Sequence, residues 1–573
     1  MQLIINRLLS LEPFTMFMYI FMFVSCIVFP IIRNILVKMD KSLKAWVICS
    51  FIPIMICIVH LLLNLYDRNE NITFELFGMV YIASIFFPLM TPLCRKKILF
   101  HVGAVLCSLL IFCGTFISMA TISSLHVRTM NYSRMSMTES YKSVIRDMKI
   151  YYPLTEWKEI DYSAIDAEVY PMVEEAEKNN DYALFSQALR RLTYLIPDGH
   201  VWYTDTLDDE GSVKLWKQFI QHNYYGFIMF TNDDGKTRAF NVNENSDAYK
   251  AGIRSGTVIT EWNGKNITQA IAETTDYIFE ENYAVKENED FILPVCLSGI
   301  GEDEIEVGFI DSDGKNKKVM IQKTDVFFYY GIEAYNRLMH NVDDENFSSR
   351  MITDDIGYLR INEERYNNVL DIKAYILGHY PEIEDRVKKE LDTMKAQGMK
   401  KLIIDLRHNA GGNPYISAAA ASVFTDKKGT VLTLKGTAVH EANIEIKLSG
   451  DGSYKDLPVV VLVNLKCGSS GDMLADIMNK FDNVKLVGMT PSMGIGQAVG
   501  ERCMLPGGCE FSFPIIYILN EYGEINVDPK ADRINRIPLD EKIPASEELI
   551  RAILEGDGED DPELDYVTEH CFD

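Results

Sequence analysis

The stretch from Leu457 to Gly496 reads LPVVVLVNLKCGSSGDMLADIMNKFDNVKLVGMTPSMGIG. It opens with a β-branched apolar run, Leu457–Asn464, which is typical of a strand buried on both faces. The small residues at 467–471 then permit a tight turn. From Asp472 onward apolar residues recur at helical spacing, so the stretch predicts a strand, a sharp turn and a helix.

Ser469 lies at this turn. A hydroxyl at the start of a helix is close to amides and to the positive end of the helix dipole, which stabilise a developing negative charge. Such a serine can act as a nucleophile. It can equally be an ordinary N-cap, because serine is a preferred residue at that position. The choice depends on whether the chain also supplies a base, an acid and an oxyanion hole.

The composition limits the class of protein. The chain has 573 residues, enough for several domains, and a formal net charge of -26. It has no basic stripe, so we expect no nucleic-acid partner. It also has no CxxC pair or histidine cluster with metal-site spacing, so we predict no metal and no cofactor. Cys503 and Cys509 flank a turn-forming spacer and could form a disulfide in an oxidising compartment.

The first quarter of the chain holds four long apolar runs. Each is near the length that crosses a bilayer, which predicts four transmembrane helices within residues 1–125, at about 13–37, 45–65, 76–93 and 98–123. Basic residues gather in the first and third loops, and such loops stay in the cytoplasm. We therefore expect a multi-pass protein of the cell membrane, in contact with the lipid bilayer, whose remaining chain is extracytoplasmic.

Residues 126–210 are expected to form a helical cap. Glu139–Met148 and Tyr182–Leu192 each carry an apolar stripe on a polar helix. The cap ends in Pro-Asp-Gly, a strong turn signal, followed directly by His200. A lone histidine is often incidental. However, imidazole is the natural general base for a serine, because its pKa lies near neutral pH.

Residues 220–325 resemble a PDZ domain. The resemblance rests on Ala248–Ile259, which reads AYKAGIRSGTVI, and on the following Asn263-Gly264. Thr257 stands where that family usually has Asp. The resemblance implies that an extended C-terminal peptide binds by strand addition, with its carboxylate on amides near Gly226, Phe227 and Ile228. Alternatively, the module only packs against its neighbours and positions them.

Residues 326–552 alternate between strand and helix patterns, which predicts an α/β core. Strands are expected at Ile356–Ile361 and Lys401–Arg407, with a charged helix at Asp385–Gln397 between them. Gly411 and Gly412 lie between a strand and a helix, where their amides could hold an oxyanion. Residues 553–573 are rich in acids and are expected to be a solvated tail.

Two motifs in this core resemble those of the tail-specific, or C-terminal-processing, serine peptidases. One is Asp405–Gly412, DLRHNAGG; the other is Val459–Asn464 followed by Gly468–Asp472, GSSGD. The resemblance implies a crotonase/ClpP-like α/β core and a polypeptide substrate. It also implies that Ser469 is the nucleophile. The oxyanion amides would come from Ser470 and from the Gly411-Gly412 pair, with Gly411 preferred.

The chain departs from many members of that family at one position. Ile495 stands where they carry the lysine of a Ser/Lys dyad, and an isoleucine cannot accept a proton. A second branch, which resembles the tricorn core protease, uses Ser, His and an acid. In that branch the histidine lies upstream of the PDZ-like module, as His200 does here. The acid is then Asp528 by spacing, with Glu524 and Asp532 as alternatives.

The combined interpretation is a membrane-anchored extracytoplasmic serine endopeptidase that acts through an acyl-enzyme. Ser469 attacks, His200 takes its proton and Asp528 orients His200. The main alternative is a catalytically inactive PDZ-containing protein that binds peptides or acts as a sensor. Two further alternatives are a one-residue shift that makes Ser470 the nucleophile, and a cysteine enzyme that uses Cys467.

Overall fold

The computed structural model describes residues 129–204, 224–274, 286–324, 329–340, 347–366, 374, 379–436, 443–497, 501–525, 527–530, 534–556 and 560–572. The chain divides into two compact units, residues 1–132 with 501–504, and residues 133–500 with 505–573. In the first unit, strand β1 (Thr129–Asn131) pairs in parallel with β16 (Glu501–Met504). Everything described below belongs to the second unit.

The predicted multi-pass membrane architecture is corrected. Among the described residues, no helix has both the length and the apolar character needed to cross a bilayer. The multi-pass region is therefore removed from the fold class, together with the cell-membrane localisation that depended on it. The four apolar runs between residues 13 and 123 lie outside the described residues.

The helical cap contains the amphipathic helices that the sequence predicts. The elements are α6 (Met137–Tyr151), α7 (Tyr162–Asn179), α8 (Tyr182–Tyr194) and the short strand β2 (Trp202–Thr204). Each helix begins at a side-chain cap, from Ser136, Asp161 and Asp181 respectively, which satisfies amides of the first turn. Strand β2 pairs with β17 (Glu510–Phe513), which follows the short 3-10 helix η1 (Pro506–Gly508).

The region whose sequence resembles a PDZ domain, called the PDZ-like module for that resemblance alone, is small and β-rich and has its own core. Its elements are β3 (Ile228–Thr231), β4 (Thr237–Phe240), α10 (Asp247–Lys250), β5 (Ile259–Trp262), β6 (Lys265–Asn266), α11 (Ile267–Ala272), α12 (Lys286–Leu297), β7 (Glu304–Ile310) and β8 (Asn316–Gln322). Strands β3 and β4 pair with each other, and the other strands form a sheet in the order β6-β5-β7-β8. Its core includes Phe227, Trp262 and Phe309.

The α/β core is built on a six-stranded sheet in the order β21-β15-β14-β11-β10-β9. Only β9 (Phe347–Met351) runs antiparallel to its neighbour. The other strands are β10 (Ile356–Ile361), β11 (Lys401–Asp405), β14 (Val459–Leu462), β15 (Val484–Gly488) and β21 (Glu541–Lys542). Every residue of β14 is buried, as its apolar run predicts.

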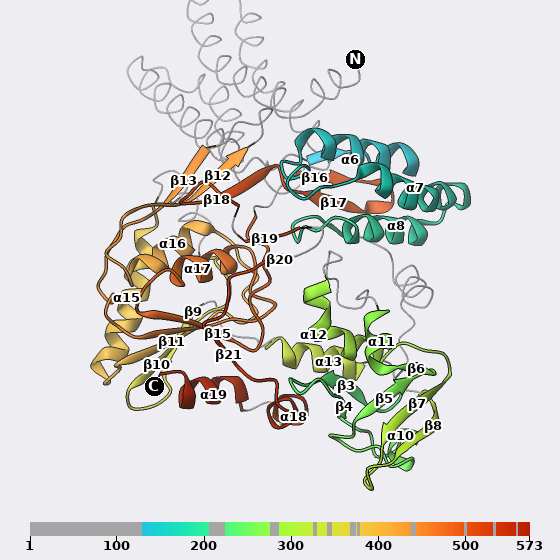
Figure 1. The fold of residues 1–573 in the computed structure, drawn as a ribbon. Helices are drawn as coiled ribbons and strands as arrows, with labels where there is room; N and C mark the ends of the chain where they lie inside the picture. Colours follow the sequence, from blue (N-terminus) through green and yellow to red (C-terminus); the bar gives the residue numbers. More distant parts are fainter. Residues whose placement is uncertain are drawn as a thin grey trace, which may run out of the picture. The chain divides into compact units, whose positions relative to one another are not determined.

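Helices cover both faces of this sheet. In Figure 1, α16 (Pro414–Ser422) and α17 (Ser470–Met478) lie on one side, and α19 (Pro562–His570) lies on the other. Helix α15 (Pro381–Ala396) joins β10 to β11, α13 (Tyr329–Leu338) precedes β9, and α18 (Glu547–Glu555) precedes α19. A smaller sheet, β13-β12-β18, contains β12 (Gly429–Gly436), β13 (Asn443–Leu448) and β18 (Ile516–Asn520). Strands β19 (Asp528–Pro529) and β20 (Ile534–Asn535) form a short hairpin.

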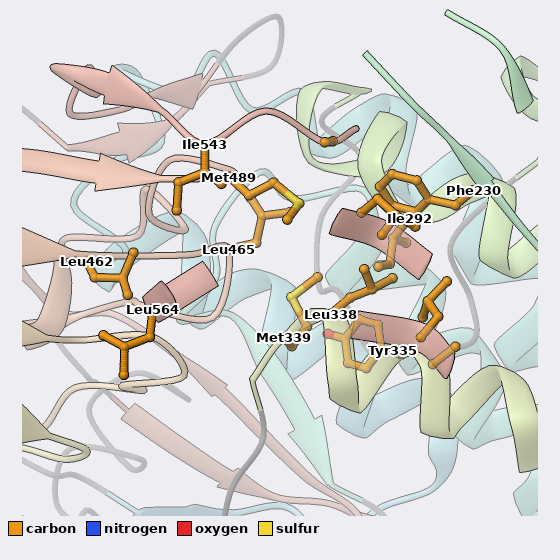
Figure 2. Close-up of a cluster of buried hydrophobic side chains, with 14 of the residues drawn as sticks. Phe230, Ile292, Tyr335, Leu338, Met339, Leu462, Leu465, Met489, Ile543 and Leu564 are labelled. Atoms are coloured by element: carbon orange, nitrogen blue, oxygen red, sulfur yellow. The ribbon is translucent and has the colours of Figure 1, made fainter. Parts of the chain in front are cut away.

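One apolar cluster joins the PDZ-like module to the core. It contains Phe230 and Ile292 from the module, Leu338 from α13, and Leu462 and Leu564 from the core. Figure 2 shows the labelled side chains of these segments gathered on either side of Leu465 and Met339, which lie between those of the core and those of the module. Burial of these apolar side chains away from water holds the two regions together.

The expectation of a solvated tail is wrong for the last part of the chain. Helix α19 forms there, and Leu564 and Val567 are buried. Two acids at its start, Asp561 and Glu563, ion-pair with Arg407 of the DLR motif at 2.5 and 3.0 Å. The acids of this segment therefore neutralise a buried cation of the core, in addition to facing water.

Asp405 completes this buried ion network. Its carboxylate pairs with Arg407 at 2.7 Å and with Arg360 at 3.2 Å. Burial acts to raise the pKa of Asp405, but the guanidinium of Arg407 outweighs it and holds this pKa well below its usual range. His340 lies 3.9 Å from Asp405 and 3.7 Å from Asp561, so these three form a group of potential metal ligands. Since guanidinium groups already engage both carboxylates, Arg407 that of Asp561 and Arg407 with Arg360 that of Asp405, we assign no metal there.

Glu364 is a second buried acid of the core, just beyond β10. Its side chain accepts a hydrogen bond from Asn409 Nδ2 at 3.0 Å. Its backbone pairs with the glycine loop, because Glu364 N donates to Gly411 O and Asn413 N donates to Glu364 O. Burial raises the pKa of Glu364 from 4.5 to about 8. This carboxyl is therefore protonated in the folded protein at neutral pH.

We expect Glu364→Gln to change how stability depends on pH. The raised pKa of Glu364 means that its contribution to stability is fully present below pH 4.5 and is lost as pH rises through about 8. Glutamine stays neutral throughout. The free energy of unfolding of the variant, relative to wild type, should therefore rise between pH 4.5 and 8 by on the order of a few kcal/mol and level off above. Urea unfolding at several pH values measures this, and a pH-independent difference would contradict it.

Candidate active site

Ser469 occupies a strained turn between β14 and α17. Its backbone has φ 54° and ψ -121°, a conformation that costs about 1–3 kcal/mol for a residue with a side chain. Ser469 is at the N-cap position, but its side chain caps no amide of α17. Instead, its Oγ lies 3.1 Å from Nε2 of His200. The hydroxyl is therefore directed to an imidazole and away from the helix amides, which argues against the N-cap interpretation.

His200 reaches Ser469 from a segment 269 residues earlier in the chain. His200 follows the predicted Pro-Asp-Gly turn, and its backbone N–H donates to Oδ1 of Asp198 at 2.8 Å. The side chain is buried, and burial lowers the pKa of His200 below 6.5; Asp198 opposes this shift and Lys158 adds to it. The imidazole is thus neutral near pH 7 and able to accept a proton from Ser469.

The two alternative nucleophiles are placed differently. Ser470 is buried, and its Oγ donates to the carbonyl oxygen of Gly412 at 2.8 Å. Cys467 is fully buried, and burial raises the pKa of its thiol well above the usual value. A thiol held in its protonated form is a weak nucleophile. Neither side chain lies against His200 in the way that Ser469 does.

The glycine loop lies directly against the turn that carries Ser469. A Cβ on Gly411 would come within 2.6 Å of Ser469 Cβ and 2.7 Å of the amide nitrogen of Ser470, and Gly411 has φ 93°. Only a glycine permits this approach. The side chain of Asn409 holds the loop, because its Oδ1 accepts the N–H of Gly411 at 2.8 Å. The backbone oxygen of Asn409 also accepts the N–H of Gly468 at 2.9 Å.

The preferred oxyanion donor changes as a result. The N–H of Gly411 is engaged by Asn409, so it is not available to a substrate oxygen in this structure. The amides of Gly412 and of Ser470 remain as candidate donors, on either side of the contact between the two loops. This difference between two adjacent glycines depends on the contact with Asn409, which no local sequence pattern predicts.

Ile495 fills the position where a dyad lysine would lie. Its side chain is buried and packs against both active-site turns, because a Cβ on Gly199 would come within 2.5 Å of it and one on Gly468 within 3.1 Å. Its backbone is fixed by Asp472, whose carboxylate accepts the amides of Gly494 and Ile495 at distances of 2.8–3.2 Å. Burial raises the pKa of Asp472 to about 6.

The structure also distinguishes between the three candidate acids. Asp528 is fully buried in β19, whereas Glu524 is exposed in the turn after β18. Asp532 lies outside the described residues. Asp528 does not accept a hydrogen bond from His200: within the described part of the chain, Nδ1 of His200 has no hydrogen-bond partner. The Asp528 carboxylate instead forms an ion pair with Lys158.

Lys158 is the residue of this site that sequence reasoning missed. Its side chain is fully buried, and it contacts Asp198 as well as Asp528. In the sequence it is one lysine within the charged run Glu156–Asp161, and nothing in that run distinguishes a buried cation from a solvated one. Only the fold brings it beside the two acids.

The predicted peptide-binding residues are buried. Gly226, Phe227 and Ile228 are all covered in this structure. Next along β3, the N–H of Met229 donates to Oγ of Ser298 at 2.7 Å, just after α12. An added peptide strand along this edge would therefore have to displace Ser298 from Met229.

Comparisons with known proteins agree with the sequence motifs. The model of Peptidase family S41 matches residues 355–530, which include Ser469, Gly411, Gly412 and Asp528 but not His200. A probable CtpA-like serine protease of Staphylococcus saprophyticus is 29% identical over 150 residues, 26% of this chain and 27% of that protein. A probable CtpA-like serine protease of Staphylococcus aureus is 25% identical over 260 residues, 45% of this chain and 41% of that protein. The matched region thus spans less than half the length of these relatives.

Among solved structures, mature CPAF complexed with lactacystin aligns with 76% of this chain and 97% of its own, at 13% identity and a TM-score of 0.47. The family match and the curated relatives confirm the resemblance to tail-specific, or C-terminal-processing, serine peptidases. They do not distinguish the Ser/His/acid branch from the Ser/Lys branch. Residues 355–530 are thus similar to Peptidase family S41, and the chain resembles CtpA-like serine proteases.

Proposed function

We propose that the protein is an endopeptidase that hydrolyses polypeptides through an acyl-enzyme on Ser469. The observation that carries the proposal is the 3.1 Å contact between Ser469 Oγ and Nε2 of a neutral, buried His200. His200 takes the proton as Ser469 attacks the scissile carbonyl, and it then returns the proton to the leaving amine. The amides of Gly412 and Ser470 hold the oxyanion.

Asp528 is the proposed acid. It is fully buried, and through Lys158 it is linked to the loop that carries His200. In a Ser/His/acid site the role of the acid is to stabilise the imidazolium that forms during attack. The same arrangement argues against the inactive peptide-binding protein, because such a protein needs no serine aligned with an imidazole.

The PDZ-like module is proposed to recognise a free C-terminus of the substrate. The sequence resemblance supports this, and Gly226 has φ 93°, a conformation that favours glycine. The buried edge of β3 sets a condition: the hydrogen bond from Met229 to Ser298 must open when a peptide binds.

Substitutions at the candidate residues should show which of Ser469 and Ser470 is the nucleophile. Ser469→Ala and His200→Ala should each lower kcat on fluorescently labelled casein by at least about 10³-fold, because residues that act as a unit fail together. Ser470→Ala, which removes only a bond to Gly412, should retain most of the activity. Thermal unfolding serves as the folding control. Equal loss in all three variants, or normal hydrolysis by Ser469→Ala, would contradict the assignment.

The acid limb of the pH profile should lie below pH 6.5. His200 acts as a base only when neutral, and burial lowers its pKa from 6.5, so kcat/KM should persist as pH falls through 6.5 and decline only below it. Asp472, with a pKa of about 6, titrates in the same range. The limb should therefore remain in Asp472→Asn. A limb at or above pH 6.5, or one that disappears in this variant, would assign it to another group.

Recognition of a C-terminus predicts a dependence on charge. A peptide with a free carboxylate should bind the inactive Ser469→Ala protein about tenfold more tightly than the same peptide ending in an amide, since hydrogen bonds to a charged group contribute about 1.5–3 kcal/mol. Ser298→Ala, which frees the N–H of Met229, should strengthen binding of both peptides. Fluorescence anisotropy measures the affinities. Equal affinities for the two peptides would argue for a module that only packs.

A further inference from the structure

Behind the candidate base, one buried ammonium contacts two separate segments of the chain. Lys158 Nζ donates to the carbonyl oxygens of Pro197 at 2.7 Å and Pro529 at 2.8 Å. It also lies 3.5 Å from the carboxylate of Asp198 and in direct ion-pair contact with Asp528. The first segment leads into His200, and the second is β19, which carries the candidate acid. Lys158 thus holds together the loop of the base and the strand of the acid.

Asp198 transmits this contact to His200. Its Oδ1 accepts the backbone N–H of His200 at 2.8 Å, and its Oδ2 accepts the hydroxyl of Tyr152. The loop is thereby held by its own turn, by the cap helix α6 through Tyr152, and by Lys158. Loss of Lys158 would leave the Asp198 carboxylate with a neutral donor in place of a cation.

The charges of the cluster require a cation at this place. Asp198, Asp528 and Lys158 have fully buried side chains, and an unpaired buried charge is costly. Burial raises the pKa of Asp528 well above its usual value, while Lys158 acts to lower it and Asp198 and Asp472 act to raise it. The Asp528 carboxyl group thus depends on Lys158 as its ion-pair partner, and the Asp198 carboxyl group lies beside the same ammonium.

We propose that Lys158 is a positioning residue for the hydrolytic reaction: its ammonium fixes the Pro197–His200 loop to β19, so that His200 faces Ser469. This inference rests on the proposed function of Ser469 and His200. It assigns a role to a cap residue outside the matched S41 segment, which contributes charge and geometry without touching the substrate.

Lys158 is not a replacement for the missing dyad lysine. A general base needs a free lone pair, whereas this amine donates to two carbonyl oxygens and faces two carboxylates. All of these neighbours are hydrogen-bond acceptors, so the amine acts toward each of them as a donor. The proton of Ser469 therefore goes to His200, and Lys158 acts only through the position and charge of its neighbours.

The test compares Lys158→Met with Lys158→Arg and Lys530→Met in the full chain. Lys530 is the matched control. Its Nζ lies 4.5 Å from the centroid of the Trp157 ring, and Trp157 is the residue that precedes Lys158 in the sequence. We expect Lys158→Met to lower kcat on labelled casein by about 10²-fold with little change in KM. Lys158→Arg should regain at least about tenfold, and Lys530→Met should behave as wild type.

The pH profile separates positioning from a general loss of structure. Of the groups that face His200, Lys158 lowers its pKa and Asp198 raises it. Removing the cation should therefore move the acid limb of kcat/KM to higher pH. A variant that is merely less stable would lose active enzyme without moving the limb. An unchanged kcat and an unchanged limb in Lys158→Met, with wild type active, would overturn the inference.

A double variant keeps the test decisive if Lys158→Met fails to fold. Lys158→Met/Asp528→Asn removes both members of the Lys158–Asp528 ion pair together, so neither is left without the other. If Lys158 and Asp528 position the loop as one ion pair, the double variant should be about as active as Asp528→Asn alone. A further loss of about 10²-fold in the double variant would contradict that route. If the folded wild type itself fails to hydrolyse casein, the proposed function fails, and this inference fails with it.

Discussion

The structure depends on one contact, that between the hydroxyl of Ser469 and the imidazole of His200. Neither residue can create it locally. Ser469 is presented by a strained turn that begins at a fully buried strand, and His200 is presented by a loop of the helical cap. The strain of the turn persists because the surrounding structure determines it: Asn409 holds Gly468, and the glycine loop packs against Ser469 at a distance that tolerates no side chain.

Buried charge is the second constraint. The core holds a network around Asp405 and Arg407, and the cap holds another around Lys158 and Asp528. Each network is stabilised by its ion pairs, because removal of one partner would leave a buried charge with neither water nor a counter-charge. The two networks also tie distant segments to the site. Arg407 connects the DLR motif to the start of α19, and Lys158 connects the base loop to β19. Chain segments that look peripheral in the sequence are thereby part of the active-site scaffold.

The spacing of apolar residues and the positions of turn-forming residues predicted much of this fold. The strand at β14, the helix at α17 and the amphipathic cap helices follow from apolar spacing, and Ser469 and His200 follow from small turns beside them. The predicted membrane architecture was wrong, because no helix among the described residues is long and apolar enough to cross a bilayer. The predicted solvated tail was wrong because α19 uses its acids as ion-pair partners. Lys158 and the engaged amide of Gly411 could not be predicted, since both depend on contacts between segments that no local pattern encodes.

The central claim is that Ser469 is an activated nucleophile. Reaction of the folded full chain with a fluorophosphonate probe, followed by mass spectrometry of the modified peptide, tests it most directly. The account predicts a single adduct on Ser469 that does not form in His200→Ala. A folded wild-type protein that forms no adduct, or an adduct on Ser470 or another residue, would contradict it.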